Sequence, residues 1–475
     1  QPYMRISNGN GKLNNFVKKN FPDSKTDLFA VFIEKCVEMA KANCYQAMLT
    51  QHSWMFLSSY EKLRDKMQMM DTVNMAHLGA RAFEEIGGEV VQTTSFIKRK
   101  TYVQRYKGKY IRLVEQTTPV GKENSFLNGE RVFVTKNQDF SKIPGMPIAY
   151  WLSNRMQEVF LHENKMEHYG VARQGLATSD NNRFLRLWSE VISERIGFRC
   201  SSCEETISRK EKWFPYIKGG AFRRWFPNKE YVVNYKNNGD EIKKSVLKKY
   251  SYLKTPDFVV KNTTTYFRKG ITWNDVSTGL FSARLVTNGY IYADAGPMFF
   301  SDKSEMYLLA YMNSCVFQEC VNLVCQGLHY STGQIPKVPC IDSEDKEQIE
   351  LLASQNFNIS KRDWDCFEVS WDFKTHPLIL GTISIEEAFN QWEKLTESQF
   401  NCLKFNEEEL NRIFIDIYGL QDELTPDVED KDVTVRKANL GRDIRSFISY
   451  AVGCMLGRYS LDVDGLLFAG GEYSV

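Results

Sequence analysis

Asp27-Leu-Phe-Ala-Val-Phe-Ile33 and Tyr45-Gln-Ala-Met-Leu-Thr50 are the two stretches that decide the fold of the first part of the chain. In the first stretch Asp27 can cap a helix that runs to about residue 43, because apolar side chains recur behind it at helical spacing. The second stretch is a short apolar run that is typical of a buried strand. A helix followed directly by such a strand favours an α/β fold.

The same alternation continues after residue 50. Ser58 and Glu61 form a capping-box pattern that predicts a helix over residues 59–70. Residues 73–78 and 89–97 read as two further strands, the second rich in Val and Thr. Helix, strand, helix, strand, loop and strand predict the back half of a Rossmann-like, doubly wound sheet.

A chain of 475 residues is too long for one core and favours several domains. We expect an α/β domain over residues 1–135 and a linker over 136–151, where Pro and Gly cluster. Short aromatic strands broken by Gly, Asn and Pro predict an α+β domain over 152–340. Residues 341–475 are acidic and predict an α-helical region.

Some elements inside these later regions are also predictable. We expect one helix over residues 305–323 and a Pro-bounded strand at the end of residues 327–339. A further helix over 442–458 has an amphipathic pattern. Its expected buried side consists of Ile444, Phe447, Ile448, Ala451, Val452 and Met455.

The small net charge of +2 conceals a strong asymmetry along the chain. Residues 195–274 hold 18 Lys+Arg against 7 Asp+Glu, whereas residues 341–432 hold 8 against 23. The basic block is also rich in Trp, Tyr and Phe. Interleaved basic and aromatic side chains suit the phosphates and bases of nucleic acid. The alternative is a solvated basic face with no ligand.

Other features narrow the class of protein. No run of about 18 apolar residues exists, so no membrane contact is expected, and no signal-peptide pattern opens the sequence. Eleven cysteines without framework spacing read as reduced thiols in a cytoplasmic protein. Cys200 and Cys203 form a lone C-x-x-C, which lacks the further ligands that a zinc site needs, so no metal is expected.

Gln1-Pro2-Tyr3, followed by a polar loop with two glycines and an apolar helix, resembles the end of the Asn-Pro-Pro-Tyr motif of DNA amino-methyltransferases. In that motif the Tyr ring stacks on a flipped base. The resemblance implies that the motif's Asn precedes residue 1 and that Gln1 replaces its first Pro. Taken alone, the tripeptide indicates an ordinary surface turn, because Pro-Tyr occurs by chance in most proteins of this length.

Longer blocks are similar to the PglX family, the adenine-specific DNA methyltransferases of bacteriophage-exclusion (BREX) systems. The similarity covers essentially the whole chain. Its most specific blocks include Asp23-Ser-Lys-Thr-Asp-Leu-Phe-Ala-Val-Phe-Ile33, Gln51-His-Ser-Trp-Met-Phe-Leu-Ser-Ser-Tyr-Glu-Lys-Leu-Arg64, Thr178-Ser-Asp-Asn-Asn-Arg-Phe-Leu-Arg186 and Lys212-Trp-Phe-Pro-Tyr216.

The resemblance implies a class I methyltransferase sheet followed by a target-recognition domain and a helical brace or docking region. It also implies methyl transfer from S-adenosylmethionine to N6 of a flipped adenine in host DNA, as part of phage defence. The main cofactor loop would precede this chain. Double-stranded DNA and other BREX proteins would be its partners.

Candidate site residues follow from both arguments. Pro2 and Tyr3 would hold the flipped base. Gln51, His52 and Trp54 follow a strand end, where α/β sheets bind ligands, so contact with the cofactor or the base is expected there. Residues with amide, guanidinium or ammonium groups suited to base edges and phosphates form the expected DNA-binding set. They are Asn181, Asn182, Arg183, Arg186, Arg223, Arg224, Lys243, Lys244, Lys248 and Lys249.

Two rival readings stay open from the sequence. The polypeptide could act as a DNA-recognition module without catalysis, or as a docking subunit of a defence complex through its acidic end. The target sequence and the oligomeric state are not encoded in any pattern that we can read.

Overall fold

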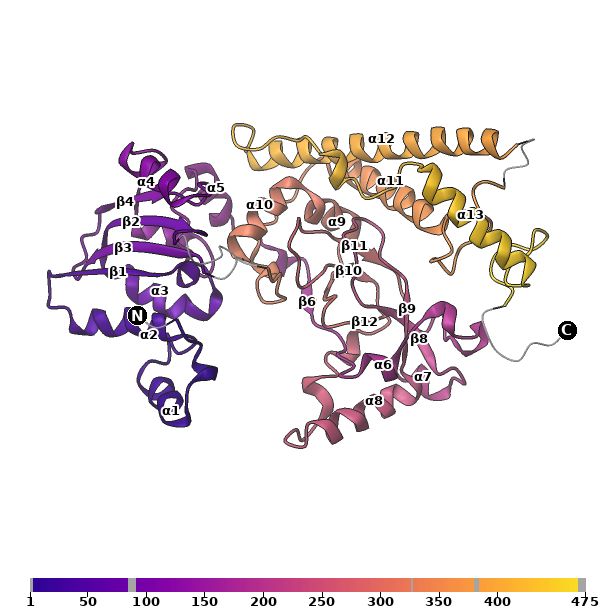
Figure 1. Ribbon diagram of the computed structural model, residues 1–475, viewed down its shortest axis with the longest axis horizontal. Helices are drawn as coiled ribbons and strands as arrows, with labels where there is room; N and C mark the ends of the chain where they lie inside the picture. The colour runs from indigo at the N-terminus through magenta and orange to yellow at the C-terminus, as the bar shows by residue number, and fades with distance from the viewer. Residues whose placement is uncertain (1–2, 84–90, 326–327, 380–383, 469–475) are drawn as a thin grey trace. The chain divides into compact units, whose positions relative to one another are not determined.

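The computed structural model shows two compact units, which are described separately (Figure 1). Unit 1 contains residues 1–163 and 322–327, and unit 2 contains residues 164–321 and 328–475. The residues that the structure describes are 3–83, 91–325, 328–379 and 384–468. Unit 2 therefore combines most of residues 152–340 with residues 341–475, whereas residues 152–163 and 322–327 belong to unit 1.

Unit 1 is built on one five-stranded sheet in the order β1-β3-β2-β4-β5. Its strands are β1 (Tyr45–Gln51), β2 (Asp71–Gly79), β3 (Thr93–Arg99), β4 (Lys107–Arg112) and β5 (Val132–Lys136). β3 pairs antiparallel with both β1 and β2, and β2 pairs parallel with β4. The carboxyl ends of β1, β2 and β4 consequently lie at the same edge of the sheet.

Five helices accompany this sheet: α1 (Gly11–Asn20), α2 (Leu28–Met39), α3 (Glu61–Gln68), α4 (Pro119–Leu127) and α5 (Asn154–Leu161). α2 and α3 bury Phe29 and Leu63 against Met75, Phe96 and Tyr110 of the sheet. This packing explains the apolar stripes in the sequence and confirms the expected α/β class.

The predicted helix cap is present at the start of α2 and absent at the start of α3. The Asp27 side chain accepts a hydrogen bond from the Phe29 N–H, so Asp27 caps α2 as expected. The expected capping box of Ser58 and Glu61 is wrong. Ser58–Tyr60 forms a 3-10 turn without a side-chain cap, and α3 begins at Glu61.

Unit 2 contains two four-stranded sheets in the orders β11-β10-β13-β6 and β12-β8-β9-β7. The strands of the first are β6 (Val171–Arg173), β10 (Gly270–Thr272), β11 (Arg284–Val286) and β13 (Met298–Phe300). Those of the second are β7 (Leu185–Leu187), β8 (Trp213–Ile217), β9 (Tyr231–Asn234) and β12 (Ile291–Tyr292). Side chains of both sheets share one aromatic-rich core.

Short helices lie beside these sheets and long helices complete the unit (Figure 1). The helices are α6 (Asn181–Phe184), α7 (Glu205–Ser208), α8 (Lys236–Lys249), α9 (Glu305–Asn313), α10 (Cys315–Val324), α11 (Lys346–Asp365), α12 (Ile385–Tyr418) and α13 (Leu440–Met455). α11 packs against both α9 and α12. None of the helices formed by described residues combines the length and apolar character that a membrane crossing requires.

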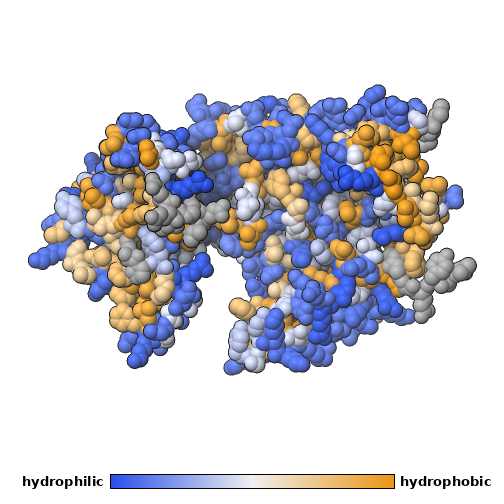
Figure 2. Space-filling view, viewed as in Figure 1, coloured by the Kyte–Doolittle hydropathy of each residue, from blue (hydrophilic) through white to orange (hydrophobic). Residues whose placement is uncertain are grey.

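Three expectations about these elements are wrong. The single helix over 305–323 is two helices, because Ser314 has an extended backbone between α9 and α10. The described part of 327–339 forms turns and a short 3-10 helix at Ile335–Lys337 and no strand. On α13, Ile448, Val452 and Met455 are exposed, although the sequence pattern predicted them to be buried. Figure 2 shows apolar surface in this region of unit 2.

Candidate functional site

The segment that carries Tyr3 is fixed to the start of α2. Met4 N–H donates to the Asp27 carboxylate at 3.1 Å, and Leu28 N–H donates to the Met4 carbonyl at 3.0 Å. Asp27 therefore serves two roles, since the same carboxylate also caps α2. The result is a defined position for Tyr3 beside the buried end of α2.

The Tyr3 ring lies edge-on to the buried Phe29 ring, with centroids 6.3 Å apart and an interplanar angle of 77°. Its exposed fraction is 37%, so part of the ring is free to contact a ligand. Burial of the remainder raises the pKa of the Tyr3 hydroxyl, which stays protonated at neutral pH. Pro2, the other residue of the expected base-holding pair, lies outside the described residues.

A pocket of about 360 Å³ opens at the carboxyl edge of the sheet, where β1, β2 and β4 end. His52 directly follows β1, and His77 lies near the end of β2. Their Nδ1 and Nε2 atoms are 2.8 Å apart, and His77 Nδ1 is 3.1 Å from the Tyr150 hydroxyl. Three polar side chains thus form one hydrogen-bonded chain beside the pocket.

Both imidazoles are neutral at neutral pH. Burial lowers the pKa of His52 to about 4. Burial, followed by the neighbouring His52, also lowers the pKa of His77 well below its usual value. A neutral imidazole can donate one hydrogen bond and accept another. His77 uses both ring nitrogens on His52 and Tyr150, so within the described contacts His52 Nε2 is the ring nitrogen that can meet a polar ligand group.

The pocket also contains a cation and an aromatic wall. The Arg112 guanidinium lies 4.5 Å from the centroid of the Trp151 ring, and both residues line the pocket. The sequence interpretation missed His77, Arg112 and Trp151. His77 lies near the end of β2 and Arg112 ends β4, and the strand order of the sheet is what brings both to His52.

The other two residues expected near this pocket differ from His52. Gln51 ends β1 and pairs with Thr93 of β3. Trp54 is fully buried, and its indole N–H donates to Thr50 Oγ1 at 3.1 Å. Trp54 therefore belongs to the core, and its placement argues against contact with a ligand. Tyr3 is not among the described residues that line the pocket.

In unit 2 the structure brings two of the expected DNA-binding segments together. Lys249 Nζ donates to the Ser179 carbonyl at 2.6 Å, and an Arg183 Nη2 atom lies 3.9 Å from the Glu241 carboxylate. Asn181 and Asn182 are exposed on the same short helix as Arg183. Residues about 60 apart in the sequence thus share one face, which we call the α6–α8 face.

The lysines of α8 project from a buried helix face. Ile242 and Val246 are fully buried, so helical spacing turns Lys244 and Lys248 outward. The regular part of α8 begins after Gly239, which has a φ of +72° and ends a run of left-handed residues. Figure 2 shows a mostly hydrophilic surface where α8 lies. The face is exposed and basic, and Lys244 Nζ pairs there with the Asp240 carboxylate at 2.6 Å.

Three arginines of the expected DNA-binding set are held by the protein itself. Arg186 donates to the carbonyls of Asn182 and Leu185, both at 2.6 Å. Arg223 and Arg224 are each only 8% exposed. Arg223 donates to the Asp363 carboxylate at 2.9 Å, and Arg224 donates to the Glu407 carboxylate at 3.1 Å.

These partners occupy the guanidinium groups that the expectation assigned to DNA phosphates. A buried guanidinium that leaves its carboxylate would strand a charge away from water, at a cost of several kcal/mol. The placement of Arg223 and Arg224 therefore argues against phosphate contact and indicates a role in joining the β-sheets of unit 2 to α11 and α12.

The C-x-x-C pair is part of the core. Cys203 Sγ contacts the Tyr235 hydroxyl and the Thr263 carbonyl, and burial raises the pKa of Cys200 to about 11. Within the described ranges, no cluster of three or more His, Cys, Asp or Glu side chains has a geometry that could hold a metal ion.

A family match near the start of the chain and a likeness to a solved structure define the class of protein. Residues 2–78 match the family described as Eco57I restriction-modification methylase. The chain also resembles the Type IIL restriction-modification enzyme MmeI, whose structure was determined in complex with DNA. The TM-score is 0.55 at 11% identity, over 95% of this chain and 56% of that one. This likeness establishes a methyltransferase-type α/β fold.

Two relatives narrow the class further. The chain is 43% identical, over 99% of its length, to the adenine-specific methyltransferase PglX of Lacticaseibacillus casei (strain Zhang). It is 36% identical, over 98% of its length, to the adenine-specific methyltransferase BrxX of Escherichia coli O9:H4 (strain HS). The resemblance to PglX is thereby confirmed. The chain spans about 40% of the length of each of these relatives.

The histidine pair predicts how the stability of unit 1 depends on pH. A histidine whose pKa is about 4 when folded and about 6.5 when unfolded binds fewer protons in the folded state between these values. The free energy of unfolding should therefore fall as pH drops from about 7 to about 4, by up to about 1.4 kcal/mol per pH unit for each histidine.

Urea unfolding at a series of pH values measures this slope. Replacing His52 and His77 together with Gln should flatten the slope, whereas replacing the exposed His329 with Gln should leave it unchanged. Equal slopes for the wild type and the double variant would contradict the burial of neutral imidazoles at this edge.

Proposed function

We propose that this chain forms the base-holding and DNA-recognising part of a site-specific N6-adenine DNA methyltransferase that acts in phage defence. The observation that carries the proposal is the 43% identity to PglX over 99% of the chain. The chain's α/β unit and its basic α6–α8 face support the two parts of this role. A cytoplasmic location, where host DNA lies, belongs to the same proposal.

In this proposal Tyr3 is the platform for the extruded adenine. A base inside a duplex cannot present its amine to a methyl donor, so it must leave the stack at a cost of a few kcal/mol. Stacking on an aromatic ring returns about 1–3 kcal/mol of that cost. The half-exposed Tyr3 ring is backed by Phe29 and fixed through Met4 and Asp27, so it is already oriented.

S-adenosylmethionine supplies the methyl group when it is bound. The carboxyl-edge pocket has groups that fit the polar parts of such a cofactor or of the target base. They are the neutral imidazoles of His52 and His77, the Arg112 guanidinium and the Trp151 ring. Methylation of an amine needs an oriented lone pair and a nearby acceptor, and a strong base is unnecessary. A neutral His52 is consistent with that requirement.

Double-stranded DNA is the proposed partner of unit 2, and other BREX proteins are further proposed partners. Phosphates would lie along the α6–α8 face, with Asn181, Asn182 and Arg183 nearest to base edges and Lys244 and Lys248 along the backbone. A DNA-recognition module without catalysis is a second candidate, because this face alone would support it.

The Tyr3 platform is tested by methyl transfer to adenine N6 in duplex DNA, measured with the full-length protein. Tyr3→Ala should lower the rate by about ten- to a hundredfold, since about 1.4 kcal/mol corresponds to a factor of ten. Tyr3→Phe should be mild, because the ring provides the stacking. Tyr45→Ala, which removes another exposed aromatic ring of unit 1, is the matched control.

The result separates the two candidates. Full-rate methylation by Tyr3→Ala would place the base elsewhere. Absence of methylation by the wild type, with DNA binding retained, would favour the recognition module.

The α6–α8 face is tested by the salt dependence of DNA affinity. Each neutralised phosphate contributes about −0.9 to the slope of log K against log salt. Replacing Lys244 and Lys248 with Ala should therefore reduce the slope by roughly 1 to 2. Lys374 and Lys431 are similarly exposed in the same unit, and their replacement with Ala should leave the slope unchanged. Equal effects of the two double variants would refute a specific role for this face.

A further inference from the structure

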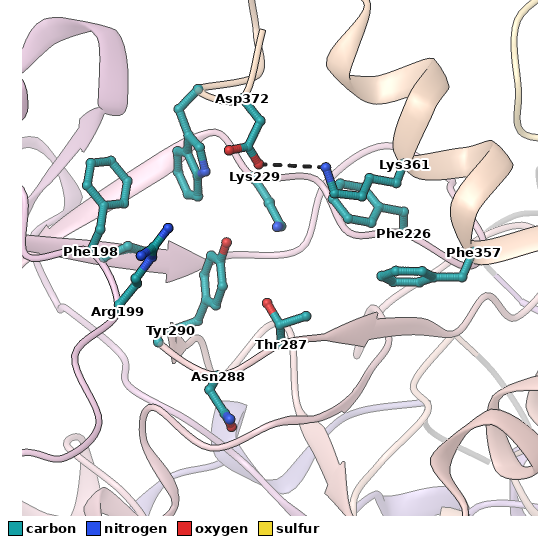
Figure 3. Close-up of a pocket in the computed structure, with 13 residues that line it drawn as sticks. Phe198, Arg199, Phe226, Lys229, Thr287, Asn288, Tyr290, Phe357, Lys361 and Asp372 are labelled. Atoms are coloured by element: carbon teal, nitrogen blue, oxygen red, sulfur yellow. Dashed lines mark ion pairs between the residues drawn. The ribbon is translucent and has the colours of Figure 1, made fainter. Parts of the chain in front are cut away.

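A cavity of about 550 Å³ lies entirely within unit 2 (Figure 3). One side is formed by residues of the β-sheet region, including Phe226, Lys229 and Tyr290. The other side is formed by Phe357 and Lys361 of α11 and by the turn after that helix. Its volume lies in the range of small-molecule sites, and none of the residues of the α6–α8 face lines it.

Lys229 is the unusual residue of this cavity. It is only 5% exposed, and no described hydrogen bond or ion pair joins its ammonium group to another residue. Figure 3 shows the ammonium group directed into the cavity. Burial lowers the pKa of Lys229 to about 8, so the group still carries its charge at neutral pH. The Asp372 carboxylate of the cavity wall stabilises this charge in part, but no described carboxylate lies within ion-pair distance of it. An anionic ligand would offset the remaining cost of burying the charge.

Aromatic rings surround this charge. The Lys229 ammonium is 4.5 Å from the centroid of the Phe226 ring and 5.1 Å from that of Tyr290. Tyr290 and Trp371 stack with centroids 5.9 Å apart and an interplanar angle of 18°. Cation–π contacts of this kind offset part of the desolvation cost. Because Tyr290 and Trp371 already stack on each other, a planar ligand would meet the aromatic lining outside that stack.

A second cation reaches the cavity from a strained backbone. Arg199 has a φ of +58°, in the left-handed region that non-glycine residues rarely adopt. Figure 3 shows its side chain beside the ring of Tyr290. Lys361 already has carboxylate neighbours in Asp365 and Asp372. The lining therefore carries three cations, Arg199, Lys229 and Lys361, against the single carboxylate of Asp372, and Arg199 and Lys229 are the two without a close ion pair among the described contacts.

We propose that this cavity binds a free nucleoside phosphate, with the base against the aromatic walls and the phosphate between Lys229 and Arg199. A planar group can pack on the aromatic lining outside the Tyr290–Trp371 stack, and an anion can neutralise the two cations. The volume admits one mononucleotide and excludes a folded macromolecule. This site is separate from the base platform at Tyr3 and from the α6–α8 face.

Calorimetric titration of the intact chain with AMP, adenosine and inorganic phosphate tests the site. AMP should bind with a Kd below about 1 mM, and adenosine and phosphate should each bind at least about tenfold more weakly. Lys229→Met should weaken AMP binding at least tenfold. Lys218→Met is the matched control, because Lys218 also lies over an aromatic ring but does not line the cavity.

A stability measurement distinguishes a ligand-binding lysine from a structural one. If Lys229 serves a ligand, Lys229→Met should raise the thermal midpoint while it lowers affinity, since it removes an unpaired buried charge. If Lys229 serves the fold through its cation–π contacts, the midpoint should fall.

Arg199→Met, at an exposed position, gives a second reading that does not depend on the core. It should also weaken AMP binding. The proposal is overturned if AMP fails to bind the wild type, if both variants bind AMP as the wild type does, or if Lys229→Met lowers the midpoint. It is also overturned if a short single-stranded oligonucleotide, and not AMP, depends on Lys229.

Discussion

Desolvation of two arginines is the constraint on which the architecture of unit 2 depends. Arg223 and Arg224 leave the sheet region and enter the helical layer, where Asp363 of α11 and Glu407 of α12 neutralise them. Burial raises the pKa of Glu407, yet Arg224 and the Trp225 indole N–H both stabilise its charged form. Removing one partner would strand a buried charge, so these two ion pairs couple the packing of the sheet region to that of α11 and α12.

This coupling has a consequence for function. Because α11 is fixed by Arg223, its Phe357 and Lys361 side chains are held over the sheet region and complete the cavity around Lys229. In unit 1 one carboxylate has two roles in a similar way. The Asp27 carboxylate caps α2 and also accepts a hydrogen bond from the Met4 N–H. A carboxylate therefore positions a candidate site in each unit: Asp363 fixes the cavity around Lys229, and Asp27 fixes Tyr3.

Local pattern predicted unit 1 well. The spacing around Phe29 and the apolar run after Tyr45 are short-range signals, and α2 and β1 follow them. Local patterns did not predict ion pairs between residues that are distant in the sequence. Arg223 is 140 residues from Asp363, and nothing near Arg223 distinguishes a buried pair from a phosphate contact. The prediction that Met455 is buried was wrong for a related reason, because an apolar stripe on a helix does not reveal whether another element covers it. The His52–His77 contact needed the strand order, which a single sequence does not supply.

In the proposed function, Tyr3 of unit 1 binds the extruded base and the α6–α8 face of unit 2 binds the duplex. Photo-crosslinking tests it most directly. The full-length protein would be irradiated on a duplex in which 5-iodouracil replaces the target adenine, and the crosslinked peptides would be identified by mass spectrometry. If Tyr3 binds the extruded base, the modified base should crosslink to Tyr3. Attachment to a residue of unit 2, with Tyr3 unmodified, would contradict it.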